Sequence, residues 1–309
     1  MYQLGVPLAN TATSKLALSF KPVCDYVYYH AADDRSAMIM DRSLMFIRSN
    51  RQIIAKILVG LLSFDASNIG RAQTISGAPS AHCSPGKFSI VIDVGHTPQA
   101  PGATSASGKT EYSFNLSLAK AIDAALTAAE FSRTYLMLST GVGADQLVER
   151  ATRAEAFGTD LFVAIHHDSV QKQYLSSWQV GGVTRQYSDV FSGYSLFVSS
   201  QTTFSKPSFQ FAELLSNALI ESGLKFSLHH AEKIKGENRT LLDQSKGIYQ
   251  FNDLIVLRQA TYPALLLEAG IIVNRTDEAV LASAERQELV AKALTAAVKE
   301  FCSMRQSIR

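Results

Sequence analysis

Cysteines and long apolar runs are scarce in this sequence, and each scarcity excludes a class of protein. The 309 residues include three cysteines (Cys24, Cys83 and Cys302) and one tryptophan. A disulfide-rich scaffold and a zinc site closed by four thiolates are therefore not expected. No run reaches the roughly 18 to 20 apolar residues that a helix needs to cross a bilayer, so we expect no permanent membrane anchor.

The main part of the chain also lacks an excess of positive or negative charge. Residues 1–72 hold 8 Lys/Arg against 5 Asp/Glu, and the rest of the chain holds 21 against 22. A near-neutral body has no basic face of the kind that nucleic acid requires, so we expect no nucleic-acid partner. The content of 47% hydrophobic and 18% charged residues is typical of one large globular domain.

An export-like segment lies away from the first residue. Basic residues at 48, 51 and 56 precede the apolar run 57–64 (ILVGLLSF), and residues 70–72 (GRA) have the small-x-small pattern of a cleavage site. We predict a secretory signal peptide that starts near Met45; the alternative is a short buried helix. The predicted organisation is an upstream extension at 1–44, a signal peptide at 45–72, a linker at 73–87 and one folded domain at 88–305. The protein is then exported, to the periplasm or cell envelope.

Two cysteines, Cys83 and Cys302, remain after the predicted cleavage. They lie near opposite ends of the folded domain, and an exported protein is free to pair them in one disulfide. The alternative is two unrelated thiols.

Short β-branched apolar runs alternate with helical periodicities after residue 88. This alternation predicts a single α/β domain, with a mainly parallel sheet covered by helices on both faces. We expect strands at 88–93, 133–138, 161–165, 194–199, 254–257 and 264–267, and helices at 115–129, 145–156, 211–222 and 277–301. The intervals 170–193 and 225–251 lack clean periodicity and predict long functional or mobile loops.

Four polar residues stand at the ends of these elements. His96 follows the first strand, His166 the third and Glu268 the last, while Glu111 precedes the first helix. Ligands of open α/β sheets bind at the carboxyl ends of strands. Two imidazoles and one carboxylate are a standard ligand set for catalytic zinc, with a fourth position left open. Taken singly, each residue has a plainer interpretation: a loop histidine, a helix-start carboxylate, or, for Glu268, a salt bridge to Arg275.

Four blocks of sequence resemble the zinc-dependent N-acetylmuramoyl-L-alanine amidases. The blocks are residues 90–96 (IVIDVGH), 111–116 (EYSFNL), 160–169 (DLFVAIHHDS) and 263–274 (PALLLEAGIIVN), in the order and approximate spacing of that family. Residues 147–150 (LVER) and 256–258 (VLR) also look like family segments. Together the blocks extend over nearly the whole folded region.

The resemblance implies roles for the four residues. His96, Glu111 and His166 would hold Zn²⁺, and Glu268 would be the catalytic general acid/base in hydrolysis of the amide between N-acetylmuramic acid and L-alanine of peptidoglycan. Peptidoglycan is then the substrate, and the need for an activator protein stays open. Two rivals remain: a carboxypeptidase-like zinc peptidase, for which the chain lacks an HxxE pair, and an inactive peptidoglycan-binding protein, although no ligand is missing.

The chain departs from the family pattern near the predicted ligands. Val94 stands where the family usually has proline, and His167 where it commonly has a small residue. We expect His167 to be a surface residue; the alternatives are a hydrogen-bond donor behind the metal ligands or a substrate contact. We expect His229 and His230, which are neighbours in the sequence, to be a solvated pair.

The aromatic residues of the first long loop suggest a further role. We predict that Trp178 helps this loop to wall the substrate groove. The alternative is that its aromatic side chains only anchor the loop to the body.

Overall fold

The structure, a computed structural model, describes residues 83–306. The predicted upstream extension and signal peptide, and most of the predicted linker, lie outside the described residues. Within them, no helix is long and apolar enough to span a membrane.

A seven-stranded sheet forms the centre of the domain, in the order β2-β1-β3-β9-β6-β8-β7. Its strands are β1 (Ile90–Val94), β2 (Thr134–Met137), β3 (Leu161–Asp168), β6 (Ser195–Val198), β7 (Leu241–Asp243), β8 (Ile248–Gln250) and β9 (Ala264–Ile271). Neighbours from β2 to β9 pair in parallel, as do β6 and β8, whereas β6 is antiparallel to β9 and β7 to β8. The predicted mainly parallel sheet is confirmed.

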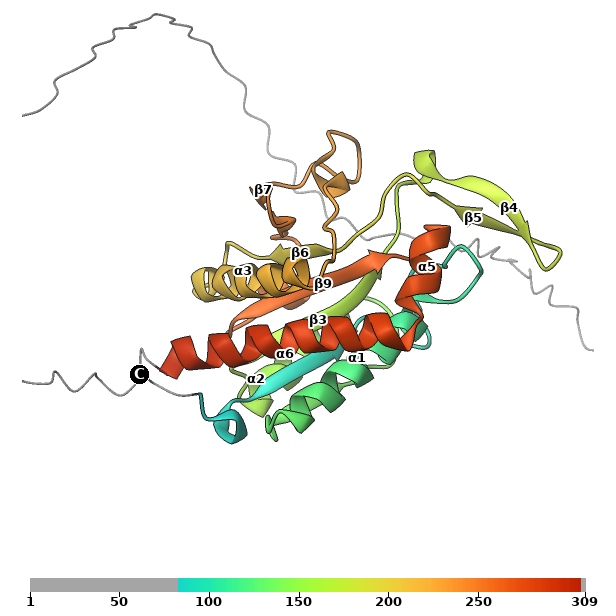
Figure 1. The fold of residues 1–309 in the computed structure, drawn as a ribbon. Coiled ribbons are helices and arrows are strands. Elements are labelled where there is room, and N and C mark those ends of the chain that lie inside the picture. Colours follow the sequence, from blue (N-terminus) through green and yellow to red (C-terminus); the bar gives the residue numbers. More distant parts are fainter. Residues whose placement is uncertain (1–82, 307–309) are drawn as a thin grey trace, which may run out of the picture. The chain divides into compact units, whose positions relative to one another are not determined.

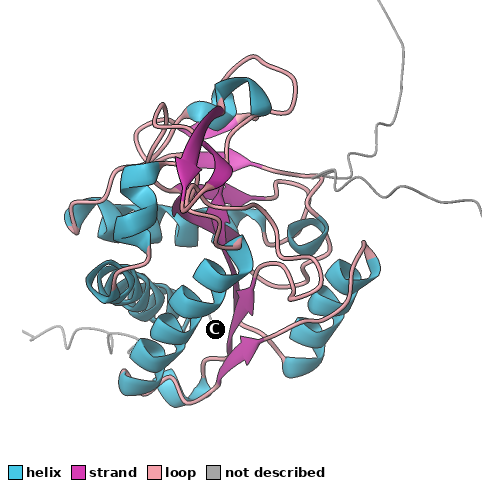
Figure 2. Cartoon of the chain, turned by 90° about the vertical axis from the view of Figure 1, so that its right-hand side faces the viewer, coloured by secondary structure: helices cyan, strands magenta, loops and turns pink. Residues whose placement is uncertain are grey.

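Helices cover both faces of this sheet, as predicted, and Figure 2 shows the strands as a layer between them. One face carries α1 (Glu111–Ala128), α3 (Ser205–Glu221) and α6 (Ala284–Gln306), which lie together in Figure 1. The other face carries α2 (Asp145–Phe157) and α4 (Ile255–Arg258), which contact each other. Because both faces are covered, alternate residues of β1 and β3 enter two separate apolar cores.

Helix α1 shows how the pattern of apolar residues positions a polar one. Phe114, Leu118, Ile122 and Leu126 are buried at near-helical spacing. Glu111 begins the same buried stripe, one turn before Asn115. Packing of the stripe against the sheet therefore also fixes the Glu111 carboxylate at the sheet edge.

Several predicted boundaries were wrong. Residues 254–257 form no strand: they overlap α4, since a short apolar run cannot be told from a buried helix by periodicity. The closing helix is two helices, α5 (Arg275–Leu281) and α6. Strands β3 and β9 run further than expected, so His166 and Glu268 lie inside strands and not after them.

The two predicted long loops contain short elements. The first holds the 3₁₀ turn η2 (Lys172–Tyr174) and the two-stranded sheet of β4 (Ser176–Val180) and β5 (Val183–Tyr187), which projects from the domain in Figure 1. The second holds η3 (His229–Ala231), β7 and β8. Their strands are only three to five residues long, too short for a clear period.

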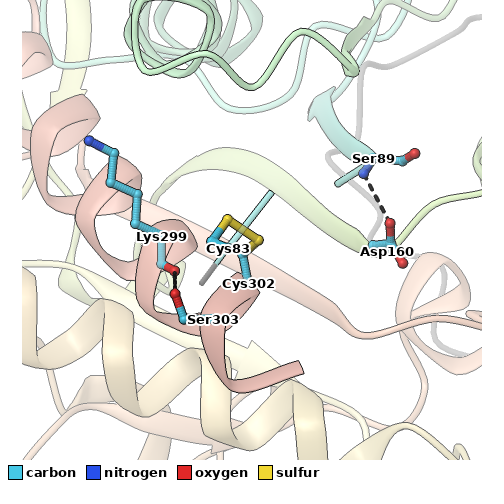
Figure 3. The surroundings of a disulfide bond; sticks show 6 residues. All are labelled: Cys83, Ser89, Asp160, Lys299, Cys302 and Ser303. Atoms are coloured by element: carbon cyan, nitrogen blue, oxygen red, sulfur yellow. Dashed lines mark hydrogen bonds between the residues drawn. A yellow bond between two sulfur atoms is a disulfide. The ribbon is translucent and has the colours of Figure 1, made fainter. Parts of the chain in front are cut away.

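Cys83 and Cys302 form a disulfide, with their Cα atoms 5.2 Å apart. The bond links α6 to the segment before η1 (Pro85–Lys87) and β1 (Figure 3). The disulfide that the sequence analysis gave as one of two alternatives is therefore present. It links the start of the described residues to the last helix of the domain.

Candidate metal centre

The structure brings the four predicted residues to one edge of the sheet. His96 follows β1, Glu111 is the first residue of α1, and His166 lies on β3. Glu268 on β9 is the direct register partner of His166 in the parallel β3–β9 pair. Adjacent strands thus place the predicted general acid/base beside a predicted ligand.

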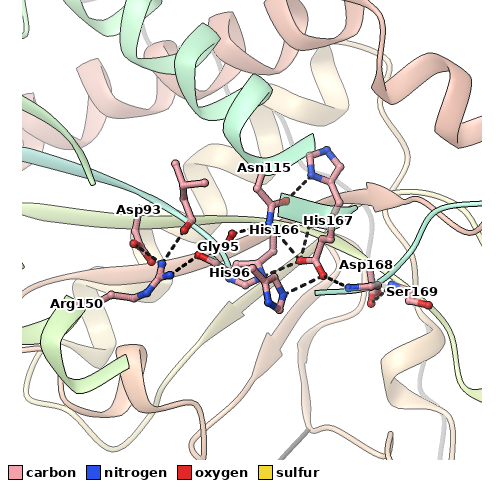
Figure 4. A network of polar contacts seen from close by, with 12 residues as sticks. Asp93, Gly95, His96, Asn115, Arg150, His166, His167, Asp168 and Ser169 are labelled. Carbon is pink, nitrogen blue, oxygen red and sulfur yellow. Dashed lines mark hydrogen bonds and ion pairs between the residues drawn. The ribbon is translucent and has the colours of Figure 1, made fainter. Parts of the chain in front are cut away.

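Three of these side chains, those of His96, Glu111 and His166, converge on a common point, and Figure 4 shows the two imidazoles side by side. His96 Nε2 is 2.9 Å from Glu111 Oε2, and His166 Nδ1 is 3.0 Å from Glu111 Oε1. The candidate ligand atoms of the three residues all lie within 4.8 Å of one another. His96 Nε2 is buried and forms no hydrogen bond with any described residue. A nitrogen that is close to a carboxylate yet makes no hydrogen bond fits a cation ligand, and the donor set suits zinc.

Neighbouring groups orient the Glu111 carboxylate. Its Oε2 accepts a hydrogen bond from the Ala103 backbone N–H at 3.0 Å, and its Oε1 accepts one from Asn115 Nδ2 at 3.3 Å. Asn115 Nδ2 also donates to the Gly95 carbonyl at 3.1 Å. One amide therefore links the helix that carries Glu111 to the loop that carries His96.

Two glycines leave room for the ligands. A Cβ atom on Gly102, whose φ is +78°, would lie 2.4 Å from Glu111 Oε2, and one on Gly95 would lie 2.4 Å from the His166 ring. His96 itself has a φ of 66°, which is uncommon for a residue other than glycine. The loop conformation therefore depends on contacts that hold it in place.

Arg150 supplies those contacts from α2. Its guanidinium bonds to Asp93 Oδ1 and to the Val94 carbonyl, each at 2.7 Å, and to the His96 carbonyl. Arg150 and Asp93 are both almost fully buried. The pair ties α2 to β1 and to the backbone of His96.

Comparison with known proteins identifies the family of this chain. The model of the N-acetylmuramoyl-L-alanine amidase family matches residues 90–300. The chain belongs to this family. A provisionally described N-acetylmuramoyl-L-alanine amidase of Buchnera aphidicola subsp. Baizongia pistaciae is 24% identical over 215 residues, which cover 69% of this chain and 95% of that protein. An N-acetylmuramoyl-L-alanine amidase of Mycobacterium tuberculosis is 28% identical over 214 residues, covering 68% and 76%.

A solved amidase shares the fold. The crystal structure of Ami1 from Mycobacterium smegmatis superposes with a TM-score of 0.53 and 21% identity, covering 71% of this chain and 98% of that chain. The predicted family and fold class are confirmed, and members of this family are hydrolases.

The electrostatics of this amidase favour an ionised Glu111. Burial alone would raise the pKa of Glu111, but the charge of His96 and the hydrogen bond from His166 outweigh burial and lower the pKa well below its usual range. Burial alone would lower the pKa of His96, but the charge of Glu111 outweighs burial and raises this pKa. Burial dominates for His166 and lowers its pKa.

Glu268 lies in a different environment from Glu111. The side chain is buried, and its Oε2 has no hydrogen-bond partner among residues 83–306. Burial, with the nearby charges of Asp168 and Glu111, raises the pKa of Glu268 well above its usual value. The alternative of a salt bridge to Arg275 is wrong, because Arg275 pairs with Asp189, with Nε 3.0 Å from Oδ2.

Three histidines differ from expectation. His167 is buried, so the surface assignment was wrong. Its Nδ1 lies 2.8 Å from Oδ1 of Asn115, whose amide donates to Glu111, so the ring supports a candidate ligand from behind. Burial lowers the pKa of His167 to about 3. His229 and His230 are also buried and lie against Asp168, so they are not a solvated pair. Sequence reasoning did not single out Asn115 or Asp168 for a role at the site, although each stands in a family-like block.

Proposed function

We propose that this amidase is a zinc-dependent hydrolase of the bond between N-acetylmuramic acid and L-alanine in peptidoglycan, and that it acts in cell-wall remodelling or cell separation. His96, Glu111 and His166 hold the ion, and Glu268 is the general acid/base. The observation that carries the proposal is the convergence of three ligand atoms beside a buried carboxylate with one free oxygen. Family membership supplies the reaction class.

The side chains of the site would then have separate chemical roles. Zinc held by these three side chains would supply the positive charge that polarises the scissile carbonyl and lowers the pKa of a water molecule. Glu268 accepts the proton of the attacking water and later donates it to the departing amine of L-alanine. Asn115 and the Ala103 N–H hold the Glu111 carboxylate in its orientation, which is the usual work of residues behind a metal ligand.

Purified peptidoglycan provides the test. The wild-type protein should release soluble stem peptide, lose this activity with a chelator, and regain it with zinc. Glu268→Gln should keep its zinc and lose hydrolysis by about 100-fold or more, because proton transfer alone contributes 10²- to 10⁴-fold. His96→Ala and His166→Ala should lose zinc from this site as well as activity.

A matched control is Glu288→Gln, which changes an exposed carboxylate paired with Lys292 on α6, and it should behave as wild type. Full hydrolysis by Glu268→Gln would overturn the assigned role. Binding of peptidoglycan without release of peptide by the wild type would instead favour an inactive binding protein. Activity that appears only after another envelope protein is added would establish the need for an activator.

The proposed function also requires export of the protein. Peptidoglycan lies outside the cytoplasm, and the basic and apolar segments of residues 48–72 are typical of a signal peptide. Mature protein from the cell envelope should begin near Gln73. A chain recovered intact from Met1 in the cytoplasm would contradict export.

A further inference from the structure

A second cluster of metal-ligating side chains lies on the same strand as the first. Asp168 ends β3, two residues after His166, and faces His229 and His230 of η3. The candidate ligand atoms of these three residues lie within 4.8 Å of one another, and all three residues are buried. Neither histidine of η3 belongs to the four family-like blocks of sequence.

The two imidazoles of this cluster approach one carboxylate oxygen at hydrogen-bond distance but without the alignment of a hydrogen bond. His229 Nε2 and His230 Nε2 lie 3.0 and 2.8 Å from Asp168 Oδ2. Yet none of these three buried atoms has a hydrogen-bond partner among the described residues. His96 Nε2 in the first cluster has the same combination of a close carboxylate and no hydrogen bond. Buried polar atoms seldom remain without partners, and three that face one point fit the ligands of a cation.

The second polar atom of each of these three side chains contacts another group. His230 Nδ1 is 2.8 Å from Glu237 Oε2, and His229 Nδ1 is 2.8 Å from Ser227 Oγ. Asp168 Oδ1 accepts a hydrogen bond from the Ser169 N–H at 2.7 Å (Figure 4). Metal-binding histidines characteristically use their second nitrogen in this way, which fixes the ring and leaves the other nitrogen for the ion.

Aromatic rings pack against both imidazoles of the cluster. Phe191 stacks on His229 at 5.2 Å between ring centroids, and Phe197 meets His230 edge-on at 4.9 Å. Gln171 Nε2 donates to Glu237 Oε1 at 2.8 Å, which in turn positions the carboxylate behind His230. A site with oriented ligands loses little conformational freedom when an ion enters.

We propose that Asp168, His229 and His230 form a second binding site for a divalent first-row transition-metal ion, with zinc as the expected occupant. Two imidazoles and one carboxylate favour zinc and its neighbours over calcium or magnesium, which prefer oxygen ligands alone. The ion would fasten η3, which precedes β7, to the end of β3. This proposal does not depend on the first cluster being catalytic.

The experiment uses the full-length, untagged chain with the first site removed by His96→Ala and His166→Ala. Titration of this double variant with Co²⁺ should show one bound ion per chain, with visible ligand-field bands and no thiolate charge-transfer band. Adding His230→Ala should abolish these bands, and adding Glu237→Gln should weaken binding by about 10- to 100-fold, as for other residues behind a metal ligand. Adding Glu288→Gln, which changes an exposed carboxylate on α6 outside the cluster, should leave binding unchanged.

Each outcome decides the proposal. Absence of Co²⁺ binding in the double variant, with near-UV circular dichroism still native, overturns it. Bands that persist after both His230→Ala and His229→Ala place the ion elsewhere and also overturn it. Glu237→Gln keeps the size of the side chain, so it tests the site even where His230→Ala fails to fold. Loss of peptidoglycan hydrolysis in the double variant bears only on the proposed function.

Discussion

Replacement of Arg150 tests whether one buried ion pair controls both stability and the metal centre. Arg150 bonds to Gln146 Oε1, Asp93 Oδ1 and the carbonyls of Val94 and His96. Arg150→Ala removes all four bonds at once. Asp93 then stays buried without its cation, and the His96 carbonyl loses the contact that holds a backbone with a φ of 66°.

The expected loss of stability is about 3 to 5 kcal/mol, the usual cost of removing one partner of a buried ion pair. That loss is a large share of the roughly 5 to 15 kcal/mol by which a domain is stable. Burial already raises the pKa of Asp93 despite the lowering effect of Arg150. Proton uptake by Asp93 will therefore limit the cost in the variant.

A second variant separates stability from site geometry. Asp93→Leu with Arg150→Met replaces the ion pair by apolar groups of similar size, and such replacements are often neutral or stabilising. It still lacks the bond to the His96 carbonyl. We therefore expect stability near wild type, but zinc affinity about 10- to 100-fold weaker, as when residues behind a metal ligand are lost.

Equilibrium urea unfolding followed by circular dichroism measures the first quantity, and competition with a chromogenic chelator measures the second. A loss below about 1 kcal/mol for Arg150→Ala would refute the stability argument, since ordinary surface changes reach that range. Zinc affinity equal to wild type in the apolar double variant would show that Arg150 does not position His96.

Two further predictions concern the disulfide and the projecting β4–β5 hairpin. The double variant Cys83→Ala with Cys302→Ala opens a loop with a sequence separation of 219, for which the chain-entropy model gives a stabilisation of at most about 5 kcal/mol. We therefore expect the free energy of unfolding in urea to fall by about 2 to 5 kcal/mol. An unchanged unfolding midpoint would contradict this expectation. Trp178 donates from Nε1 to the Ala106 carbonyl at 2.8 Å, with the Arg275 guanidinium 5.2 Å from its ring. We expect Trp178→Ala to slow peptidoglycan turnover without loss of zinc, with Trp178→Phe intermediate; equal losses of thermal stability and turnover would show that the ring only anchors the hairpin.

The first four candidate residues could be found from sequence because each stands beside a strong local signal. His96 and His166 adjoin apolar β-branched runs, and Glu268 directly follows three leucines. A parallel sheet then brings the ends of β1, β3 and β9 together, whatever the details of packing. The boundaries were less predictable: β3 and β9 continue through polar residues because their partners, and not their composition, extend the pairing.

The environment of the remaining histidines depends on long-range contacts that composition does not record. His229 and His230 stand in a polar stretch, where solvent exposure is the ordinary expectation. Their burial follows from Phe191, Phe197 and Tyr249, which come from three separate segments. Similarly, His167 is buried because α1 places Asn115 and Phe114 against it.

Strand β3 connects the two clusters, and its pairing with β9 explains how they coexist. His166 is opposite Glu268, whereas Asp168 is opposite Ile271, so β9 carries one more residue than β3 over this interval. An extra residue of this kind bends a strand and redirects its side chains, and such bulges are frequent next to active sites. His166 and Asp168 can therefore belong to two separate clusters although only one residue lies between them in the sequence. Glu268 is the register partner of His166, and the charges of Asp168 and of Glu111 both raise its pKa. An ion bound at Asp168 would offset one of these two negative charges, so occupancy of the second site would alter the environment of the proposed general acid/base without any contact with substrate.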